Sequence, residues 1–266
     1  MATEAAPAEA PLHAAGARLP RRAAVVVFLA FAFAYFLSAL LRAVTATLSP
    51  VLVETFGLSA QSLGLLGGAY FAGFALMQWP LGHALDRWGP RPVVLALLSL
   101  AVLGCLAFAL ARGFAGLLAA RFLIGVGVSA CLMAALTGYR RWFDAAAQLR
   151  ANAWMLMTGS LGMVASTLPV QWLLPVLGWR GVFWGLAGLL ALAMALVAVF
   201  VPRDGAVRAG PEAGAASGGG YREIVRHPLF VRTAPAGFFI YGGMIGVQAL
   251  WAGPWLTRVT GLDAGA

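Results

Sequence analysis

Seven long apolar runs, separated by short loops that carry arginine, limit what this chain can fold into. The runs fall near residues 23–46, 60–81, 93–111, 115–138, 153–175, 181–201 and 234–256. Each is close to the roughly 20 residues that a helix needs to cross a bilayer. An apolar segment in lipid must satisfy its own backbone hydrogen bonds, and the sequence lacks the alternation typical of barrel strands. We therefore predict an all-α, polytopic bundle of transmembrane helices.

The composition supports a lipid bilayer as the solvent of this chain. Hydrophobic residues make up 62% of it and charged residues only 10%, which is too little polar surface to coat a water-soluble globule of 266 residues. The net charge of +9 comes from arginine alone, but the arginines lie between apolar runs and form no basic face for nucleic acid. Cys105 and Cys131 lie inside apolar runs without metal-ligand spacing, so we expect neither a metal nor a cofactor.

The arginines also predict an orientation. With a cytoplasmic N-terminus, thirteen of the eighteen lie on the inner side, which follows the positive-inside rule. The first run is longer than the roughly 7–15 apolar residues of a signal peptide, so we interpret it as an uncleaved helix. This predicts a multi-pass protein of the inner (plasma) membrane.

Two polar segments divide the chain into four parts. Residues 1–22 are predicted to be a disordered cytoplasmic tail, and 23–201 an N-terminal bundle of six transmembrane helices. Residues 202–232 combine a glycine-rich linker with a short helix on the membrane surface. Residues 233–266 then hold the first helix of a truncated C-terminal bundle. This organisation suggests a protein of two six-helix halves whose C-terminal half is missing. The missing half would be the partner of the N-terminal half.

The loop between the second and third runs carries a specific motif. Its residues Gly82, Asp86, Arg87, Gly89 and Arg91 resemble the signature GxxxDRxGRR of the major facilitator superfamily, with proline at position 90 in place of an arginine. The side of the membrane and the number of the span also match. The resemblance implies that these five residues form a gate on the cytoplasmic side, where glycines allow a tight turn and the carboxylate pairs with positive groups.

A second motif lies in the fourth run. Arg121, Gly125 and Gly127 resemble the superfamily's RxxxGxG pattern, although isoleucine occupies position 124. The resemblance implies a six-helix half plus one helix of the second half, and a secondary active transporter that works by alternating access. The fifth run lacks the glycine-proline signature of drug antiporters, which makes multidrug efflux less favoured.

Candidate solute ligands lie on one stripe of the first run. Steps of three and four residues place Tyr35, Ser38, Arg42, Thr45 and Ser49 on the same helix face. Exposing an arginine to lipid near the midplane costs roughly 2.5 kcal/mol or more, so the stripe is predicted to face a watery cavity. The alternative is that the Arg42 side chain snorkels to the outer headgroups.

Further candidates lie in the fourth and seventh runs. Arg121 starts in the same half of the membrane as the stripe, and two arginines without a carboxylate partner could share an anion. Tyr241 and Gln248 are seven residues apart on one helix face. The first run faintly resembles organophosphate antiporters, but their second arginine is absent here, so a carboxylate or another anion remains open. No acidic residue occurs inside any predicted span, so this part of the chain offers no buried proton carrier.

Two other classes of protein compete with a transporter of a small, anionic solute. A complete seven-span receptor or interaction protein would have the same topology. An integral membrane enzyme would need acids, bases or metal ligands that converge in a pocket, and the runs offer none. We therefore expect that the protein is not an enzyme.

Overall fold

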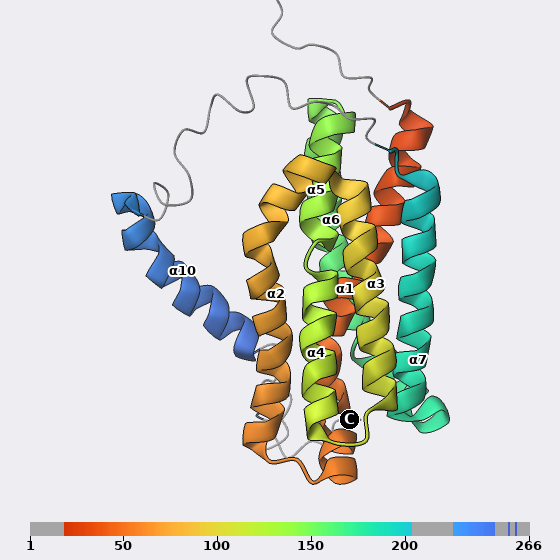
Figure 1. The fold of residues 1–266 in the computed structure, drawn as a ribbon, viewed down its shortest axis with the longest axis vertical. Coiled ribbons are helices and arrows are strands. Elements are labelled where there is room, and N and C mark those ends of the chain that lie inside the picture. Colours follow the sequence, from red (N-terminus) through yellow and green to blue (C-terminus); the bar gives the residue numbers. More distant parts are fainter. Residues whose placement is uncertain (1–18, 204–225, 248–254, 256–258, 260–266) are drawn as a thin grey trace, which may run out of the picture.

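The computed structural model describes residues 19–203, 226–247, 255 and 259. Figure 1 shows an up-and-down bundle of helices, with a further helix standing beside it. The helices are α1 (Arg21–Phe56), α2 (Ala60–Trp88), α3 (Pro90–Leu110), α4 (Phe114–Val128), α5 (Cys131–Trp142), α6 (Ala145–Ala165), α7 (Leu168–Phe200) and α10 (Pro228–Gly246). The predicted all-α bundle is confirmed.

Five helical segments are long and apolar enough to cross a membrane. They are α1, α2, α3, the pair α4–α5 and α7. The chain is therefore an integral membrane protein, and its described spans fall where five of the seven apolar runs predicted them. The α3–α4 pair lies at the front of the bundle in Figure 1, and α1 lies behind it.

The ends of the helices alternate as the arginine pattern predicted. The α2–α3 turn, the α5–α6 turn and the end of α7 lie at the same end of the bundle as the start of α1 (Figure 1). The backbone N–H of Leu19 donates to the carbonyl oxygen of Trp142 at 3.1 Å, which ties the start of the described chain to the end of α5. We call this the arginine-rich end, because Arg87, Arg91, Arg140 and Arg141 lie here.

Helix α1 is longer than the predicted run of 23–46. It continues through Pro50 to Phe56, so Glu54 lies in its last turn, exposed. Proline has no N–H for the carbonyl four residues before it, here that of Ala46. The hydroxyl of Ser49 donates to this oxygen at 2.8 Å, and this bond lets the helix pass the proline. The stripe residue Ser49 thus has a local structural role.

The run predicted for 153–175 is not one helix. Helix α6 ends at Ala165, and α7 begins at Leu168. The hydroxyls of Ser166 and Thr167 donate to the carbonyl oxygens of Met163 and Val164 at 2.6 and 2.7 Å. These side chains satisfy the last carbonyls of α6, and the proline that follows at position 169 lacks an N–H to continue it. The prediction of a continuous span was therefore wrong, because apolar content alone does not detect these caps.

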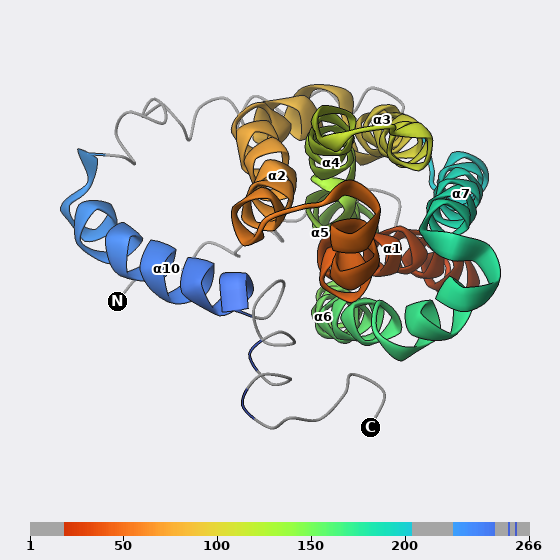
Figure 2. The ribbon, with the colours of Figure 1, turned by 90° about the horizontal axis from the view of Figure 1, so that it is seen from below.

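A second bend separates the start of α7 from its long part. Gly178 has φ of +63°, a left-handed conformation that breaks the helix and that side chains other than glycine rarely adopt. Figure 2 shows the chain arching from α6 around the bundle to the long part of α7. The part of α7 after the bend matches the predicted run of 181–201.

Glycines bring α4 close to its neighbours. A Cβ atom on Gly125 would collide with the carbonyl oxygen of Tyr70 in α2, and one on Gly127 would collide with the backbone of Ala101 in α3. Helices in a membrane approach closely where small residues meet. The two glycines of the predicted motif therefore act in packing, because they let α4 approach both α2 and α3 closely.

The second polar segment is described only in part. Residues 204–225, which include most of the predicted linker and surface helix, lie outside the described residues. Helix α10 begins at Pro228, within the range predicted for the linker, and continues to Gly246. Its residue Tyr241 is described, whereas Gln248 lies outside the described residues.

Candidate functional site

The polar stripe of α1 faces the interior of the bundle. Tyr35, Ser38 and Thr45 are 8%, 1% and 2% exposed. Arg42, between them, is half-buried. If the stripe faced lipid, these side chains would be exposed on the outer surface of the bundle. Their burial shows that this face of α1 packs on protein.

The surroundings of Arg42 are aromatic. Its guanidinium carbon lies 5.6 Å from the centroid of the Phe74 ring of α2, a distance at which a cation interacts with the π system. The hydroxyls of Tyr70, Tyr35 and Tyr241 are close enough to interact electrostatically with its charge. Because α1 reaches Phe56, Arg42 is about 21 Å from that helix end at 1.5 Å per residue. The contact with Phe74 places the guanidinium beside α2.

Among the residues that the structure describes, no carboxylate pairs with Arg42. In the helices that the structure describes, the acidic residues are Glu54 and Asp86, each in the last turn of its helix. Glu54, twelve residues along α1, is about 18 Å away. The described helices therefore leave the positive charge of Arg42 without a carboxylate partner.

Arg121 has a different environment. It is 1% exposed, and its Nη1 donates to the carbonyl oxygen of Leu41 at 3.0 Å. Its guanidinium carbon lies 5.0 Å from the centroid of the Tyr70 ring. Within the described part of the chain its Nε has no hydrogen-bond partner. Arg121 thus links α4 to α1 and α2, and in this conformation it is closed to solvent.

Several polar groups near the stripe are already engaged in the protein. The Ser38 hydroxyl donates to the carbonyl of Val128, and the Tyr70 hydroxyl donates to that of Ser38, both at 3.4 Å. Gln78 of α2 donates to the carbonyl of Ser129 at 3.4 Å. The hydroxyl of Thr45 has no partner among the described residues. The structure therefore leaves few polar groups beside Arg42 for a solute.

Tyr35 is held in place by α6. A Cβ atom on Gly159 would lie 2.7 Å from the Tyr35 ring, so only glycine allows the ring to lie against this helix. Sequence reasoning chose Tyr35 but missed two aromatic residues of α2, Tyr70 and Phe74. The Tyr70 ring lies against Arg121, and the Phe74 ring lies against Arg42. Their spacing of four residues in α2 was a usable signal, because it places both rings on one face.

The predicted gate residues lie at the arginine-rich end. Gly89 has φ of +82° and makes the turn between α2 and α3, which explains glycine there. Arg91 donates to the carbonyl oxygen of Ala198, in the last turn of α7. Arg87 is exposed, with its guanidinium carbon 5.9 Å from the Trp88 ring centroid.

Asp86 and Gly82 are exposed and line a groove of about 280 Å³ between α2 and α5. Met133 and Thr137 form the α5 side of this groove. Arg141 of α5 donates to the carbonyl oxygen of Leu85 at 3.1 Å and so fixes the end of α2 beside it. The groove offers a carboxylate at the surface, next to a position without a side chain.

Taken together, these features define a class of protein: a membrane-embedded helical bundle with an uncompensated cation deep in one helix and a glycine turn at its arginine-rich end. Residues 31–265 match the model of the Major Facilitator Superfamily. The chain belongs to this superfamily.

Three curated relatives carry the names of transporters. The chain is 28% identical over 144 residues to the hexuronate transporter of Escherichia coli K12, which covers 54% of this chain and 33% of the relative. It is 30% identical over 165 residues to the 4-hydroxybenzoate transporter PcaK of Pseudomonas aeruginosa, covering 62% and 37%. It is 32% identical over 134 residues to the multidrug transporter MdfA of Yersinia pestis, covering 49% and 32%. The chain thus spans about a third of the length of these relatives.

A solved structure has the same fold. The structure is that of a bacterial homolog to the human lysosomal transporter Spinster, in an inward-facing and unoccupied conformation. The TM-score is 0.71 at 22% identity, and the match covers 92% of this chain and 58% of the other. At this identity the likeness shows the fold alone.

Proposed function

We propose that the chain forms the solute-binding half of a secondary active transporter. The solute of this transporter is a small organic anion, and its mechanism is alternating access. One observation carries the proposal: Arg42 is half-buried deep in α1, and no acidic residue of the described bundle neutralises it. The hexuronate and 4-hydroxybenzoate of two relatives' names are both organic anions. We place the arginine-rich end on the cytoplasmic side of the plasma membrane, with the N-terminus there.

The chemistry of Arg42 suits a carboxylate. Its planar guanidinium can donate two parallel hydrogen bonds to the two oxygens of one carboxylate. The hydroxyls of Tyr35 and Tyr241 lie within electrostatic range of Arg42, and the Phe74 ring packs against the guanidinium. Arg121, whose guanidinium lies against the Tyr70 ring, is closed to solvent in this conformation and adds positive potential.

A cationic drug fits this site less well. The name of one relative includes multidrug transport. However, a cation near the middle of this bundle would meet two arginines and no described carboxylate. Like charges in a low dielectric repel strongly, so an anion is the favoured solute.

The test is uptake of labelled 4-hydroxybenzoate and galacturonate by cells that express the intact gene product. Arg42→Ala is expected to lower the apparent affinity by about 100-fold, because two charge-assisted hydrogen bonds are lost. Arg42→Lys keeps the charge but loses the planar donor pair, so it should fall between Ala and the parent. Wild-type affinity in both variants, at equal amounts of protein in the membrane, would contradict the role of Arg42.

We further propose that Asp86 acts in the gate. Its exposed carboxylate, beside Gly82 in the α2–α5 groove, is suited to a positive group on the other half of the transporter. Asp86→Asn should reduce the rate of uptake several-fold while membrane insertion stays normal, since asparagine keeps the shape and removes the charge. Asp144→Asn, at the start of α6 on the same end, is the control. Equal rates in the Asp86 variant and the parent would remove Asp86 from the gate.

A further inference from the structure

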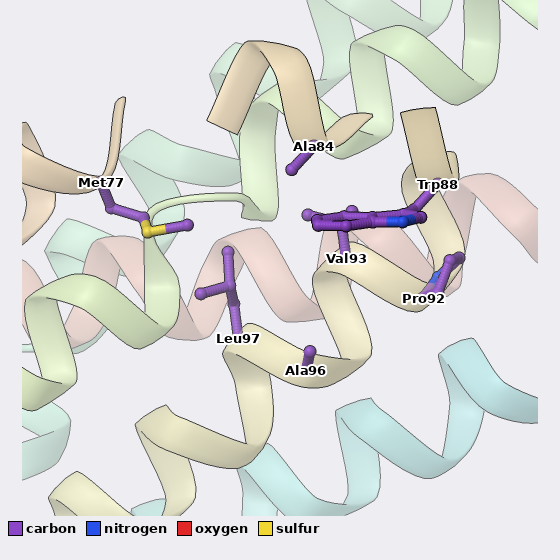
Figure 3. Close-up of a pocket in the computed structure, with 7 residues that line it drawn as sticks. All are labelled: Met77, Ala84, Trp88, Pro92, Val93, Ala96 and Leu97. Atoms are coloured by element: carbon purple, nitrogen blue, oxygen red, sulfur yellow. The ribbon is translucent and has the colours of Figure 1, made fainter. Parts of the chain in front are cut away.

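A second groove opens between α2 and α3. It lies on the other side of α2 from the α2–α5 groove lined by Asp86, which we call the gate groove. It has a volume of about 310 Å³ and is lined by Met77, Ala84, Trp88, Pro92, Val93, Ala96 and Leu97. Figure 3 shows Met77 and Trp88 at its two ends, with Leu97 between them. Its volume is at the lower end of the roughly 300–1,000 Å³ of small-molecule pockets.

The course of α2 explains why the groove exists. Helix α2 contains Pro80, whose ring cannot fit a straight helix interior, and beyond it the helix bends across toward α3 (Figure 1). Packing between α2 and α3 is sparse, because α4 lies between them for most of their length. The bend therefore closes the top of a hollow whose walls are the two helices.

The lining residues come from one face of each helix. Met77, Ala84 and Trp88 follow steps of seven and four on α2, and Pro92 and Ala96 are four apart on α3. Apart from the indole N–H of Trp88, no side chain of the lining offers a hydrogen bond. An occupant must therefore be a hydrocarbon over most of its length.

The mouth of the groove has the opposite character. Trp88 is 60% exposed, and the Arg87 guanidinium lies next to its ring. Tryptophan is enriched at the level of the lipid headgroups, and arginine binds phosphate with paired hydrogen bonds. Asp86 is two residues from both Ala84 and Trp88, which places it on the opposite side of the helix, in the gate groove. The Asp86 carboxylate is therefore not part of this mouth.

We propose that this groove binds one anionic phospholipid, with an acyl chain between Met77 and Trp88 and the phosphate at Arg87. The positive charge of the mouth selects a headgroup with net negative charge over a zwitterionic one. A lipid seated here contacts both sides of the Gly89 turn, since Trp88 precedes it and Pro92 follows it. The site is separate from Arg42 and does not depend on the proposed solute.

Native mass spectrometry of the purified, delipidated chain tests the proposal, with dioleoyl phosphatidylglycerol and dioleoyl phosphatidylcholine as probes. The two lipids have the same chains, so the headgroup is the only difference. We expect one phosphatidylglycerol per chain to bind about fivefold more tightly than phosphatidylcholine, the effect of one arginine near an anionic headgroup. Arg87→Gln should remove this preference, whereas Arg150→Gln, an exposed arginine of α6, should keep it.

A second pair of variants tests the groove itself. Ala96→Phe fills it and should weaken binding of both lipids about tenfold, equivalent to roughly two buried methylenes. Ala107→Phe is the control, because Ala107 is exposed on the same face of α3 three turns further along. If Ala96→Phe fails to fold, Ala96→Leu provides a smaller filling with a smaller expected loss.

Three results would overturn the proposal. Equal affinity for the two lipids in the parent would show that the arginine selects nothing. An equal effect of Ala96→Phe and Ala107→Phe would indicate lipid that merely surrounds the bundle. Full competition by inorganic phosphate would show that the acyl chain, and hence the groove, contributes nothing.

Discussion

Arg42 and Arg121 both lie near one tyrosine, Tyr70, yet their environments differ. Arg121 is closed to solvent and donates to the backbone of α1, whereas Arg42 is half-buried and rests against the Phe74 ring. Both are arginines in apolar helices without a described carboxylate beside them. The comparison teaches that an intramembrane charge is not by itself a ligand-binding group, because a neighbouring helix carbonyl can occupy its donors.

The strongest way to break this comparison is to truncate both arginines. Arg121→Ala should lower the free energy of unfolding by about 2–4 kcal/mol, because it leaves a cavity and removes a buried hydrogen bond. Arg121→Met refills the volume and should recover most of the loss. Arg42→Ala should cost less, about 1 kcal/mol, because the half-buried side chain loses its contact with the Phe74 ring but no hydrogen bond to a backbone carbonyl. Denaturant unfolding in detergent micelles measures all three, and equal losses for the two alanine variants would contradict the distinction.

The packing that encloses Arg121 provides the next test. Gly125 is one turn along α4 from Arg121, and a side chain there would collide with the backbone of Tyr70. Gly125→Val should destabilise the bundle by about 1–3 kcal/mol, since neither backbone can move aside.

The matched control for that variant is Gly188→Val. Gly188 is also in a helix, and no atom lies within 4 Å of a Cβ built on it. Thermal unfolding of the two variants should therefore differ clearly. A Gly125 variant as stable as the Gly188 variant would mean that α4 can shift away from α2, and that the close approach at Tyr70 is not required.

The smallest expected effect concerns the lower part of the α1 stripe. Ser49→Ala removes the bond to the Ala46 carbonyl that Pro50 leaves free, and should cost about 1 kcal/mol. Ser160→Ala, which removes a hydroxyl bonded to the carbonyl of Leu156 four residues before it, should stay within about 0.5 kcal/mol. The unfolding midpoints of the two variants check this, and an unchanged Ser49→Ala midpoint would show that water replaces the hydroxyl.

The sequence predicted what depends on period and composition. Apolar length located five spans, and steps of three and four identified the α1 face that carries Arg42. The motif located the loop between α2 and α3, and Gly89 has the left-handed backbone that such a turn needs. These features are local in the chain, so a single sequence contains them.

Other features depend on contacts between distant residues or on small side chains. The break at Ser166 and Thr167 arises from two hydroxyl caps inside an apolar run, which hydropathy does not detect. That Arg121 is sealed by Leu41 and Tyr70 depends on the approach of three helices. Before these contacts are known, Arg42 and Arg121 are equivalent candidates.

Three arginines donate hydrogen bonds to backbone oxygens at helix ends, and this limits which mutations can remove the contacts. Arg91, Arg141 and Arg180 donate to the main-chain oxygens of Ala198, Leu85 and Ala111, each at the carboxyl end of a neighbouring helix. A cation there is favoured by the helix dipole. Because the acceptor is backbone, substitution of Ala198, Leu85 or Ala111 leaves it in place, and only the arginine can be lost by point mutation. These hydrogen bonds involve no second side chain that could covary with the arginine. A search for paired substitutions among relatives would therefore not detect them.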